Sequence, residues 1–431
     1  AIFSGYRSPS LFSAGEKVNL GLTYNGVTGY RSDDEVSNFR IRPERRHEYE
    51  LGADISLFDG SMGISTTIYN AVNNDVIYNV DVTPSTGADE MTANGASIGN
   101  KGIEFTIDYR AIDTEKLKWN SKLIYASNKN SVLEMNGITG SMAKIMNEDL
   151  VPSRGIAKFS EVSPGREYAE FKVLSWARFG YGMVVDHDLN INTPDVNIDT
   201  LKDYSWSKND VYVAKNGLPI MYSQKIWSGY APNPDWTGSF FNELSIGRKL
   251  KISCLIDISI GGHIANYTKN ALYEWGTHAD TDKRYHPDFD NPNWHGYQEG
   301  VSTNWGKGTF QELLNHNHKS IGPGQDTIIT YSQNFYENYM GRNTDVINNI
   351  EDASYAKLRE LSLSYNFGKI NNSYLGNPGV IVRLSAQDLI TWTKYSGWDP
   401  ETNMYQDRIS GEDYFNQPQT WRANLALQLN W

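Results

Sequence analysis

The chain has 431 residues, a formal net charge of −12 and a mean hydropathy of −0.54. This length suits either two or three soluble domains or one large barrel. No apolar run approaches the roughly 18 residues of a membrane-spanning helix, which excludes a helical membrane protein. The acidic balance argues against nucleic acid as a partner, and the single cysteine, Cys254, excludes an internal disulfide framework.

Segments in which every second residue is apolar recur along the chain, and this period indicates β-strands. We predict eleven antiparallel strands, over residues 1–13, 17–25, 47–58, 62–82, 101–111, 118–128, 236–247, 250–262, 352–367, 378–390 and 420–431. The last segment is the clearest, because Leu425, Leu427 and Leu429 alternate with mostly polar residues between Trp421 and Trp431. A strand with one apolar face, one polar face and flanking aromatic residues is typical of an outer-membrane barrel.

The lengths of the connections also favour a membrane barrel. Counted back from the last strand, short connections alternate with long ones, and the long ones cover residues 25–46, 84–100, 129–235, 262–351 and 391–420. In an up-and-down barrel every other connection lies on the same side, so all the long loops fall at one end. Bacterial outer-membrane barrels have short periplasmic turns and long extracellular loops. We therefore predict an all-β fold, a transmembrane antiparallel β-barrel whose long loops are extracellular.

The odd number of strands predicts that this chain does not close a barrel by itself. Single-chain bacterial barrels carry an even number of strands, and an open sheet would leave two unpaired edges in hydrocarbon. The chain also begins within a pattern, at Ala1-Ile2-Phe3, and lacks an initiator Met. We expect a processed or truncated piece whose partner strands lie upstream in the parent protein or in another chain.

Four blocks of sequence match a known family in order and spacing. They are Arg42-Pro43-Glu44-Arg45 with Tyr49-Glu50-Leu51-Gly52, Gly99-Asn100-Lys101-Gly102-Ile103-Glu104-Phe105, Asp352-Ala353-Ser354-Tyr355-Ala356-Lys357-Leu358-Arg359-Glu360-Leu361, and Gln387-Asp388-Leu389-Ile390-Thr391-Trp392-Thr393-Lys394-Tyr395-Ser396-Gly397-Trp398-Asp399-Pro400-Glu401. With these blocks the chain resembles the SusC/RagA-type TonB-dependent transporters of Bacteroidetes. Asp388 departs from the pattern, because the family usually has Asn there.

The resemblance implies that residues 1–431 form the C-terminal half of a 22-stranded barrel in the bacterial outer membrane, with no plug domain in this chain. It implies the import of oligosaccharides or peptides beneath a SusD-like surface lipoprotein, energised by TonB-ExbB-ExbD through the plug. The other implied partners are the N-terminal half of the barrel with its plug, outer-membrane lipid, and a second transporter–lipoprotein pair that completes a dimer. It implies neither an enzyme nor a cofactor.

Aromatic residues in or beside the long loops are the candidates for contact with substrate or with a lipoprotein lid, since Trp and Tyr anchor interfaces. They are Trp227, Tyr230, Trp236, Trp275, Trp294, Tyr297, Trp305, Trp392, Tyr395 and Trp398. The alternative is that these rings pack the loops together or belong to the outer aromatic belt. Tyr109, Trp119 and Trp431, at the ends near the short turns, fit that belt.

Six of the eight histidines lie in the predicted loop 262–351, namely His263, His278, His286, His295, His316 and His318. Histidine near carboxylates can bind a metal, but this spacing fits no zinc pattern, and Asp280-Thr281-Asp282 lacks the Gly and terminal Glu of a calcium loop. A solvated external loop explains them better, so we predict no metal site and no catalytic residues.

A different class of protein also fits part of the pattern. An aromatic-rich β-sandwich or propeller that binds or cleaves carbohydrate would contain many short alternating strands. It would be soluble, and both faces of its sheets would be covered by protein. The apolar stripe from Leu250 to Ile260 distinguishes the two, because only a barrel exposes such a stripe to lipid.

The barrel assignment predicts the behaviour of the parent protein on gels. In detergent, the unheated protein should migrate differently from the boiled protein, because a membrane barrel keeps its fold until it is heated. A parent protein that is soluble and folded without detergent would contradict the assignment.

Overall fold

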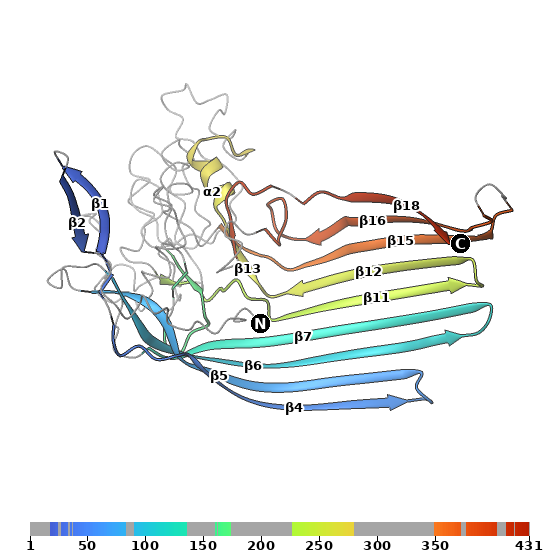
Figure 1. Cartoon of the computed structure of the whole chain (residues 1–431), viewed down its shortest axis with the longest axis horizontal. Helices are drawn as coiled ribbons and strands as arrows, with labels where there is room; N and C mark the ends of the chain where they lie inside the picture. Colours follow the sequence, from blue (N-terminus) through green and yellow to red (C-terminus); the bar gives the residue numbers. More distant parts are fainter. Residues whose placement is uncertain are drawn as a thin grey trace, which may run out of the picture.

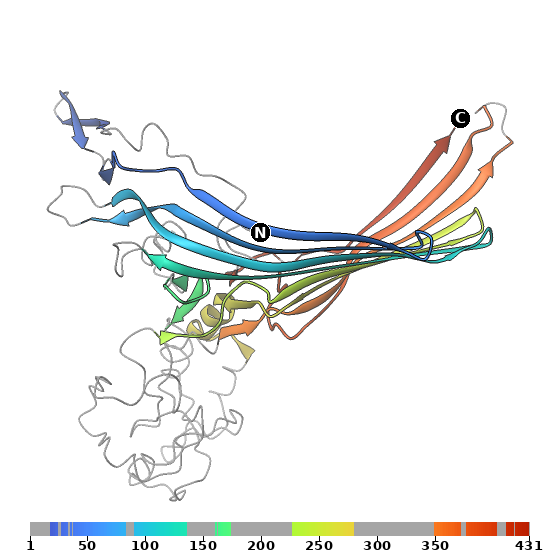
Figure 2. The same cartoon turned by 90° about the horizontal axis from the view of Figure 1, so that it is seen from below.

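One large curved sheet dominates the computed structural model (Figures 1 and 2). The structure describes residues 18–24, 27–32, 35–36, 38–82, 90–135, 160–161, 163–173, 226–279, 349–371, 376–402, 411–417 and 419–430. No helix in these ranges is long and apolar enough to cross a membrane.

The sheet is an antiparallel meander in which neighbours in sequence are neighbours in space. Its strands are β4 (Arg45–Leu57), β5 (Met62–Asp81), β6 (Glu90–Asp113), β7 (Leu117–Met135), β11 (Trp236–Ile246), β12 (Leu250–Ile260), β15 (Tyr355–Lys369), β16 (Gly379–Thr393) and β18 (Arg422–Asn430). The short β3 (Glu35–Val36) adds to β6 in parallel. Among the described strands, β4 and β18 are the two edges and do not pair with each other.

Nine of the eleven predicted strands are found in this sheet. Residues 17–25 were expected to join it, but β1 (Val18–Tyr24) instead forms a separate hairpin with β2 (Val27–Ser32). Residues 1–13 lie outside the described residues. The predicted loop 84–100 is also wrong in part, because β6 begins at Glu90 and pairs with β5 up to Asp81. The alternation of residues 90–100 is weak, so sequence alone placed the start of this strand too late.

The short and long connections separate to opposite ends of the sheet, as predicted. In Figure 1 the turns after β4, β6 and β11 lie at one end, while the long connections leave at the other. The turn after β4 spans residues 58–61, with Phe58 and Asp59 in the left-handed region at φ 55° and 52°. Gly60 follows at φ 81°, a conformation that glycine adopts without strain.

One face of the sheet is apolar from edge to edge. Because side chains of paired residues share a face, the register aligns one continuous row across six strands, made of Ile55, Ile64, Ile107, Leu123, Phe240 and Ile256. On β18, Leu425 and Leu427 are 76% and 64% exposed. No second layer of described protein covers them, which disagrees with a sandwich or a propeller. This outer face is the one that contacts lipid.

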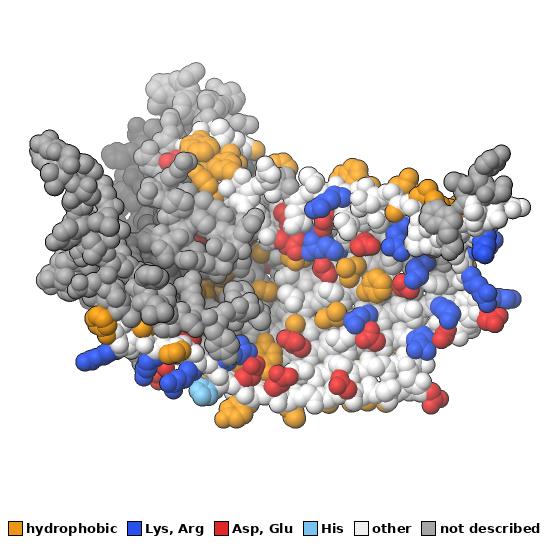
Figure 3. Space-filling model, in the orientation of Figure 1, with side chains coloured by type: hydrophobic (Ala, Val, Ile, Leu, Met, Phe, Trp, Pro, Cys, Tyr) orange, Lys and Arg blue, Asp and Glu red, His pale blue; other side chains and the backbone are white. Residues whose placement is uncertain are grey.

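The other face carries charged and hydroxyl side chains (Figure 3). Lys122 pairs with Asp108 at 3.3 Å, Lys251 pairs with Glu243 at 3.0 Å, and the Ser65 hydroxyl donates to Asp54. Asp54, Glu104 and Asp108 lie on this inner face, where their register partners place them. A polar inner face beside an apolar outer face is the arrangement of a membrane barrel.

A small module lies beyond the long-loop end of the sheet, and we refer to it as the cap. Its elements are β8 (Ser160–Glu161), β9 (Glu170–Val173), β10 (Ile226–Trp227), β13 (His263–Asn266), α2 (Tyr267–Glu274), β14 (Ile350–Asp352) and β17 (Glu412–Asp413). Its core consists of Phe171, Val173, Ala265, Tyr267 and Ile350, with Tyr230 and Tyr414 packed against it. Asn266 caps α2 by accepting a hydrogen bond from the backbone N–H of Lys269 at 2.9 Å. The predicted loops 129–235, 262–351 and 391–420 thus contain ordered elements.

Arginine substitutions at the same depth should have different effects on barrel stability on the two faces of the sheet. Ile256→Arg puts a cation on the lipid face and should destabilise the barrel by about 2–4 kcal/mol near mid-bilayer. Ile124 is 40% exposed on the inner face. It pairs with Ser239, which pairs with Asp257, so it lies one residue row away from Ile256. Ile124→Arg should therefore assemble nearly as well as wild type. Heat-modifiability after insertion into membranes measures both, and equal loss in the two variants would contradict the assignment of faces.

Candidate functional site

Two cations on β15 organise the inner wall near its extracellular end. Lys357 and Arg359 both point to the polar face, where they meet carboxylates from β12, β16 and the segment that follows β16. The backbone register shifts between Leu358 and Glu360, so Arg359 sits in a bulge. A bulge bends a strand and re-aims a side chain.

The Arg359 guanidinium binds three carboxylates. Its Nε donates to Asp257 at 2.8 Å, its Nη1 donates to Asp388 at 2.9 Å, and its Nη2 donates to Glu401 at 2.6 Å. Asp388 adopts φ 52°, a left-handed conformation that Asp and Asn tolerate better than most residues. Because its carboxylate is charged, the aspartate at this position accepts a stronger hydrogen bond from Arg359 than an amide oxygen would.

Lys357 is almost completely buried, with its side chain 1% exposed. Its ammonium group donates to Asp399 at 3.1 Å, to Glu401, and to the Gln419 side-chain oxygen at 3.4 Å. A buried cation of this kind needs such partners, and breaking a buried ion pair by removing one member costs about 3–5 kcal/mol.

Residues 394–402, which we name the strap, connect this network to the cap. At one end Asp399 and Glu401 bind the cations of β15. At the other end the Tyr395 hydroxyl donates to Asp413 at 2.6 Å, and the Ser396 backbone N–H donates to Glu351 at 2.8 Å. The strap therefore fixes the position of the cap relative to the barrel wall.

Two carboxyl groups outside the membrane-spanning strands have strongly shifted pKa values. Partial burial alone would raise the pKa of Glu401, but hydrogen bonds from Arg359, Lys357 and Tyr355 outweigh it and lower the pKa to about 2. Burial raises the pKa of Glu412, on β17 in the cap, to about 7.

A cavity of about 420 Å³ adjoins the network, and we call it the Arg422 cavity. Its lining consists of Arg359, Asp388, Gln417, Gln419, Thr420 and Arg422. Arg422 begins β18 and is paired with Gln387, so it shares the inner face with the network. Every side chain that lines this cavity can form hydrogen bonds, which suits a polar ligand.

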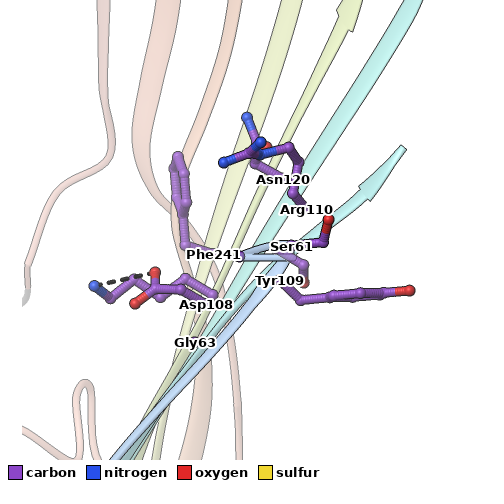
Figure 4. Close-up of a pocket in the computed structure, with 10 residues that line it drawn as sticks. Ser61, Gly63, Asp108, Tyr109, Arg110, Asn120 and Phe241 are labelled. Carbon is purple, nitrogen blue, oxygen red and sulfur yellow. Dashed lines mark ion pairs between the residues drawn. The ribbon is translucent and has the colours of Figure 1, made fainter. Parts of the chain in front are cut away.

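A second cavity of about 380 Å³ lies at the short-turn end (Figure 4). Lys122, Asp108 and Phe241 line it from the inner face, and Ser61 lines it from the turn after β4. In Figure 4 the Tyr109 ring points away from the other labelled side chains, and the dashed line marks the ion pair of Lys122 with Asp108. This cavity opens at the end of the barrel opposite the cap.

The structure describes seven of the ten predicted aromatic residues. Tyr230 stacks on His263, with ring centroids 4.3 Å apart, and Tyr395 is 5% exposed, so both pack the cap. Trp227 packs under two cations, with Arg166 4.4 Å and Lys172 5.1 Å from its ring. Trp294, Tyr297 and Trp305 lie outside the described residues, as do His286, His295, His316 and His318.

Trp236 and Trp392 lie on the outer face. Trp236 stacks on Tyr125, with centroids 5.5 Å apart, and Trp392 shares a row with Tyr125 through Ala356, Ile258 and Gly238. These positions suit the aromatic belt. Trp275 and Trp398 are 59% and 75% exposed beyond the wall, and Trp275 stacks on Phe415 at 5.4 Å. Of the seven predicted residues that the structure describes, these two present the most surface to a ligand or partner.

Sequence reasoning missed Lys357, Arg359 and Arg422. A signal for the first two was available, since cations at 357 and 359 and carboxylates at 399 and 401 both recur with the period of a strand face.

The sequence also contains one string that resembles a hydrolase motif. Gly95-Ala96-Ser97-Ile98-Gly99 matches the G-x-S-x-G string of hydrolases, but Ser97 lies within β6, not at a strand-to-helix turn, and its hydroxyl donates to Asn74 at 3.1 Å. It lacks the geometry of a nucleophile.

Comparison with known families and proteins shows which barrels this chain is similar to. Residues 4–152 match the family described as TonB dependent receptor-like, beta-barrel. TonB-dependent receptor P3 of Formosa agariphila is 23% identical over 99% of this chain, and TonB-dependent receptor P39 of the same species is 31% identical over 27% of it. The chain spans 38% of the length of P3 and 11% of that of P39.

Solved structures agree on the fold. The chain is similar to a structure of the RagAB peptide transporter, with a TM-score of 0.59 and 15% identity over 97% of this chain and 38% of the other. The RagAB peptide importer in its open-open state gives a TM-score of 0.60 and 16% identity, with the same coverage. The open sheet seen here therefore has the architecture of a segment of a larger barrel.

The ion-pair network predicts a pH-dependent strap. Because the pKa of Glu401 falls from its ordinary 4.5 to about 2 in the folded protein, its contribution to stability is complete above pH 4.5 and is lost as the pH falls toward 2. Hydrogen exchange of residues 394–402, corrected for intrinsic rates, should accelerate over this range. Glu401→Gln should show fast exchange already at pH 7, whereas Glu115→Gln, in an exposed turn, should match wild type. A Glu401→Gln strap that stays protected would disprove the role of the network.

Proposed function

We propose that this chain belongs to the SusC/RagA type of TonB-dependent receptor β-barrel, in the bacterial outer membrane, and that it forms part of an importer for oligosaccharides or peptides. Import of this kind needs a wall with lipid on one side and water on the other. The outer face of β4 to β18 is apolar, and the inner face carries hydrated, paired charges. This difference between the two faces is the observation on which the proposal depends. The proposal includes no chemical step, so it needs no catalytic residue and no cofactor.

The proposal assigns different partners to different parts of the molecule. The edges β4 and β18 would pair with the remaining strands of the barrel, and a plug in that other part would contact TonB-ExbB-ExbD. The cap would face a SusD-like surface lipoprotein, with two such pairs forming a dimer. Trp275 and Trp398, exposed on the extracellular side, are the proposed contacts for the lipoprotein or for cargo.

Peptides and oligosaccharides both remain candidates for the cargo. The similar RagAB proteins are described as a peptide transporter and importer, which supports peptides. Exposed Trp rings and a cavity lined by hydrogen-bonding groups suit sugars equally well.

Uptake by whole cells tests this function. Cells that express the full-length transporter should accumulate labelled short peptides or labelled oligosaccharides, and deletion of the transporter gene or of TonB should abolish the accumulation of one of the two. Porin-mediated uptake of a free monosaccharide serves as the control and should not change. Equal uptake of both cargo classes by the parent and by both deletion strains would refute the proposal.

A further inference from the structure

We propose that the Arg422 cavity is a subsite for a carboxylate group on the cargo. This inference rests on the proposed import function and adds to it the chemistry of one contact. The carboxylate could be the C-terminus or an acidic side chain of a peptide, or a uronic acid of a glycan. The group that would bind it is the Arg422 guanidinium, with help from the neighbouring amide and hydroxyl groups.

Two of the hydrogen-bond acceptors that line the cavity are already engaged. Asp388 accepts from Arg359 at 2.9 Å, and the Gln419 side-chain oxygen accepts from Lys357 at 3.4 Å. Because the oxygen of Gln419 faces Lys357, its NH₂ group is directed elsewhere and remains able to donate. Arg359 uses four of its five N–H donors on Asp257, Asp388 and Glu401.

Several hydrogen-bond donors remain in the cavity. No ion pair or side-chain hydrogen bond joins Arg422 to another residue in the described part of the chain, and Arg422 is exposed on the inner face. Thr420 supplies a hydroxyl, and Gln417 an amide that can turn either way. A cavity that offers a free guanidinium together with hydroxyl and amide donors fits an anionic acceptor with two oxygens.

Each carboxylate of the neighbouring network is paired with a cation of β15. Asp257 and Asp388 point to Arg359, Asp399 points to Lys357, and Glu401 bridges both cations. The network holds four carboxylates and two cations, so it keeps an excess of negative charge, and Arg422 is the one lining cation outside it. Binding of an anion here therefore depends on the Arg422 contact. The cavity lies on the inner face beside Gln419, which accepts a hydrogen bond from Lys357 of the network.

Two pairs of ligands test the proposal with the full-length transporter in detergent. Trialanine is compared with trialanine amide, and trigalacturonic acid with its methyl ester, by isothermal titration calorimetry. In each pair only the carboxylate differs. One of the two acids should bind about tenfold more tightly than its neutral counterpart, which is the effect expected of a charge-assisted hydrogen bond. The pair that responds distinguishes a peptide from a uronic acid.

Two arginine variants locate the effect. Arg422→Gln should abolish the preference for the acid, because it removes the cation and keeps an amide. Arg383 lies on the same inner face, in β16 and outside the cavity. Arg383→Gln removes the same charge and should keep the preference for the acid. Heat-modifiability confirms that both variants are folded.

Three results would overturn the subsite. They are an unchanged preference in Arg422→Gln, equal binding of acid and neutral ligand to the wild type, and no binding of any of the four ligands at millimolar concentration. None of these depends on uptake by cells, so the import function can survive the loss of this inference. Conversely, a transporter that binds the acid through Arg422 but imports nothing would refute the function alone.

Discussion

Main-chain hydrogen bonding in hydrocarbon is the constraint on which this structure depends. Every N–H and C=O group that faces lipid must find a partner within the protein, and an antiparallel sheet provides one for each interior strand. Once the strands pair, the period of two fixes which side chains meet lipid and which meet water. The row from Ile55 to Ile256 stays in register across six strands, so a slip by one residue would place charges in the bilayer.

Two of the departures from regular pairing lie in the charged part of the wall. Register shifts occur between Leu255 and Ile256 on β12 and between Leu358 and Glu360 on β15, beside the carboxylates that bind Arg359. Buried ion pairs are seldom more stable than well-packed apolar residues of the same size. Their value here is geometric, since Lys357 and Arg359 hold the strap, and the strap holds the cap through Tyr395 and Ser396.

The sequence predicted what depends on period and left out what depends on distant contacts. The strands of the sheet, the two faces and the separation of short turns from long connections all follow from alternation in segments such as Leu250–Ile260. The start of β6 and the hairpin of β1 with β2 were not predicted, because weak alternation does not specify which partner a strand chooses. The cap was predicted as loop, since β13, β14 and β17 are two to four residues long and pair with residues about 90 to 150 positions away.

The candidate site shows the same limit. Exposed aromatics were an obvious choice for contacts, yet the register sends Trp236 and Trp392 outward, and packing encloses Tyr230 and Tyr395. The two family-like blocks that contain Lys357, Arg359, Asp388 and Glu401 were recognised separately. Their contact with each other arises only from folding, because β16 pairs with β15 and the strap then turns back over the inner face.

The left-handed backbone at Asp388 suits aspartate and asparagine alike, although the two side chains differ in charge. Aspartate and asparagine are the two side chains, apart from glycine, that most readily accept φ 52°, so the bulge would tolerate either with little distortion. They differ by one full unit of charge beside a guanidinium that Asp388 shares with two other acidic groups. A single nucleotide change at this codon therefore changes the electrostatic potential of the inner face and leaves the architecture of the sheet intact.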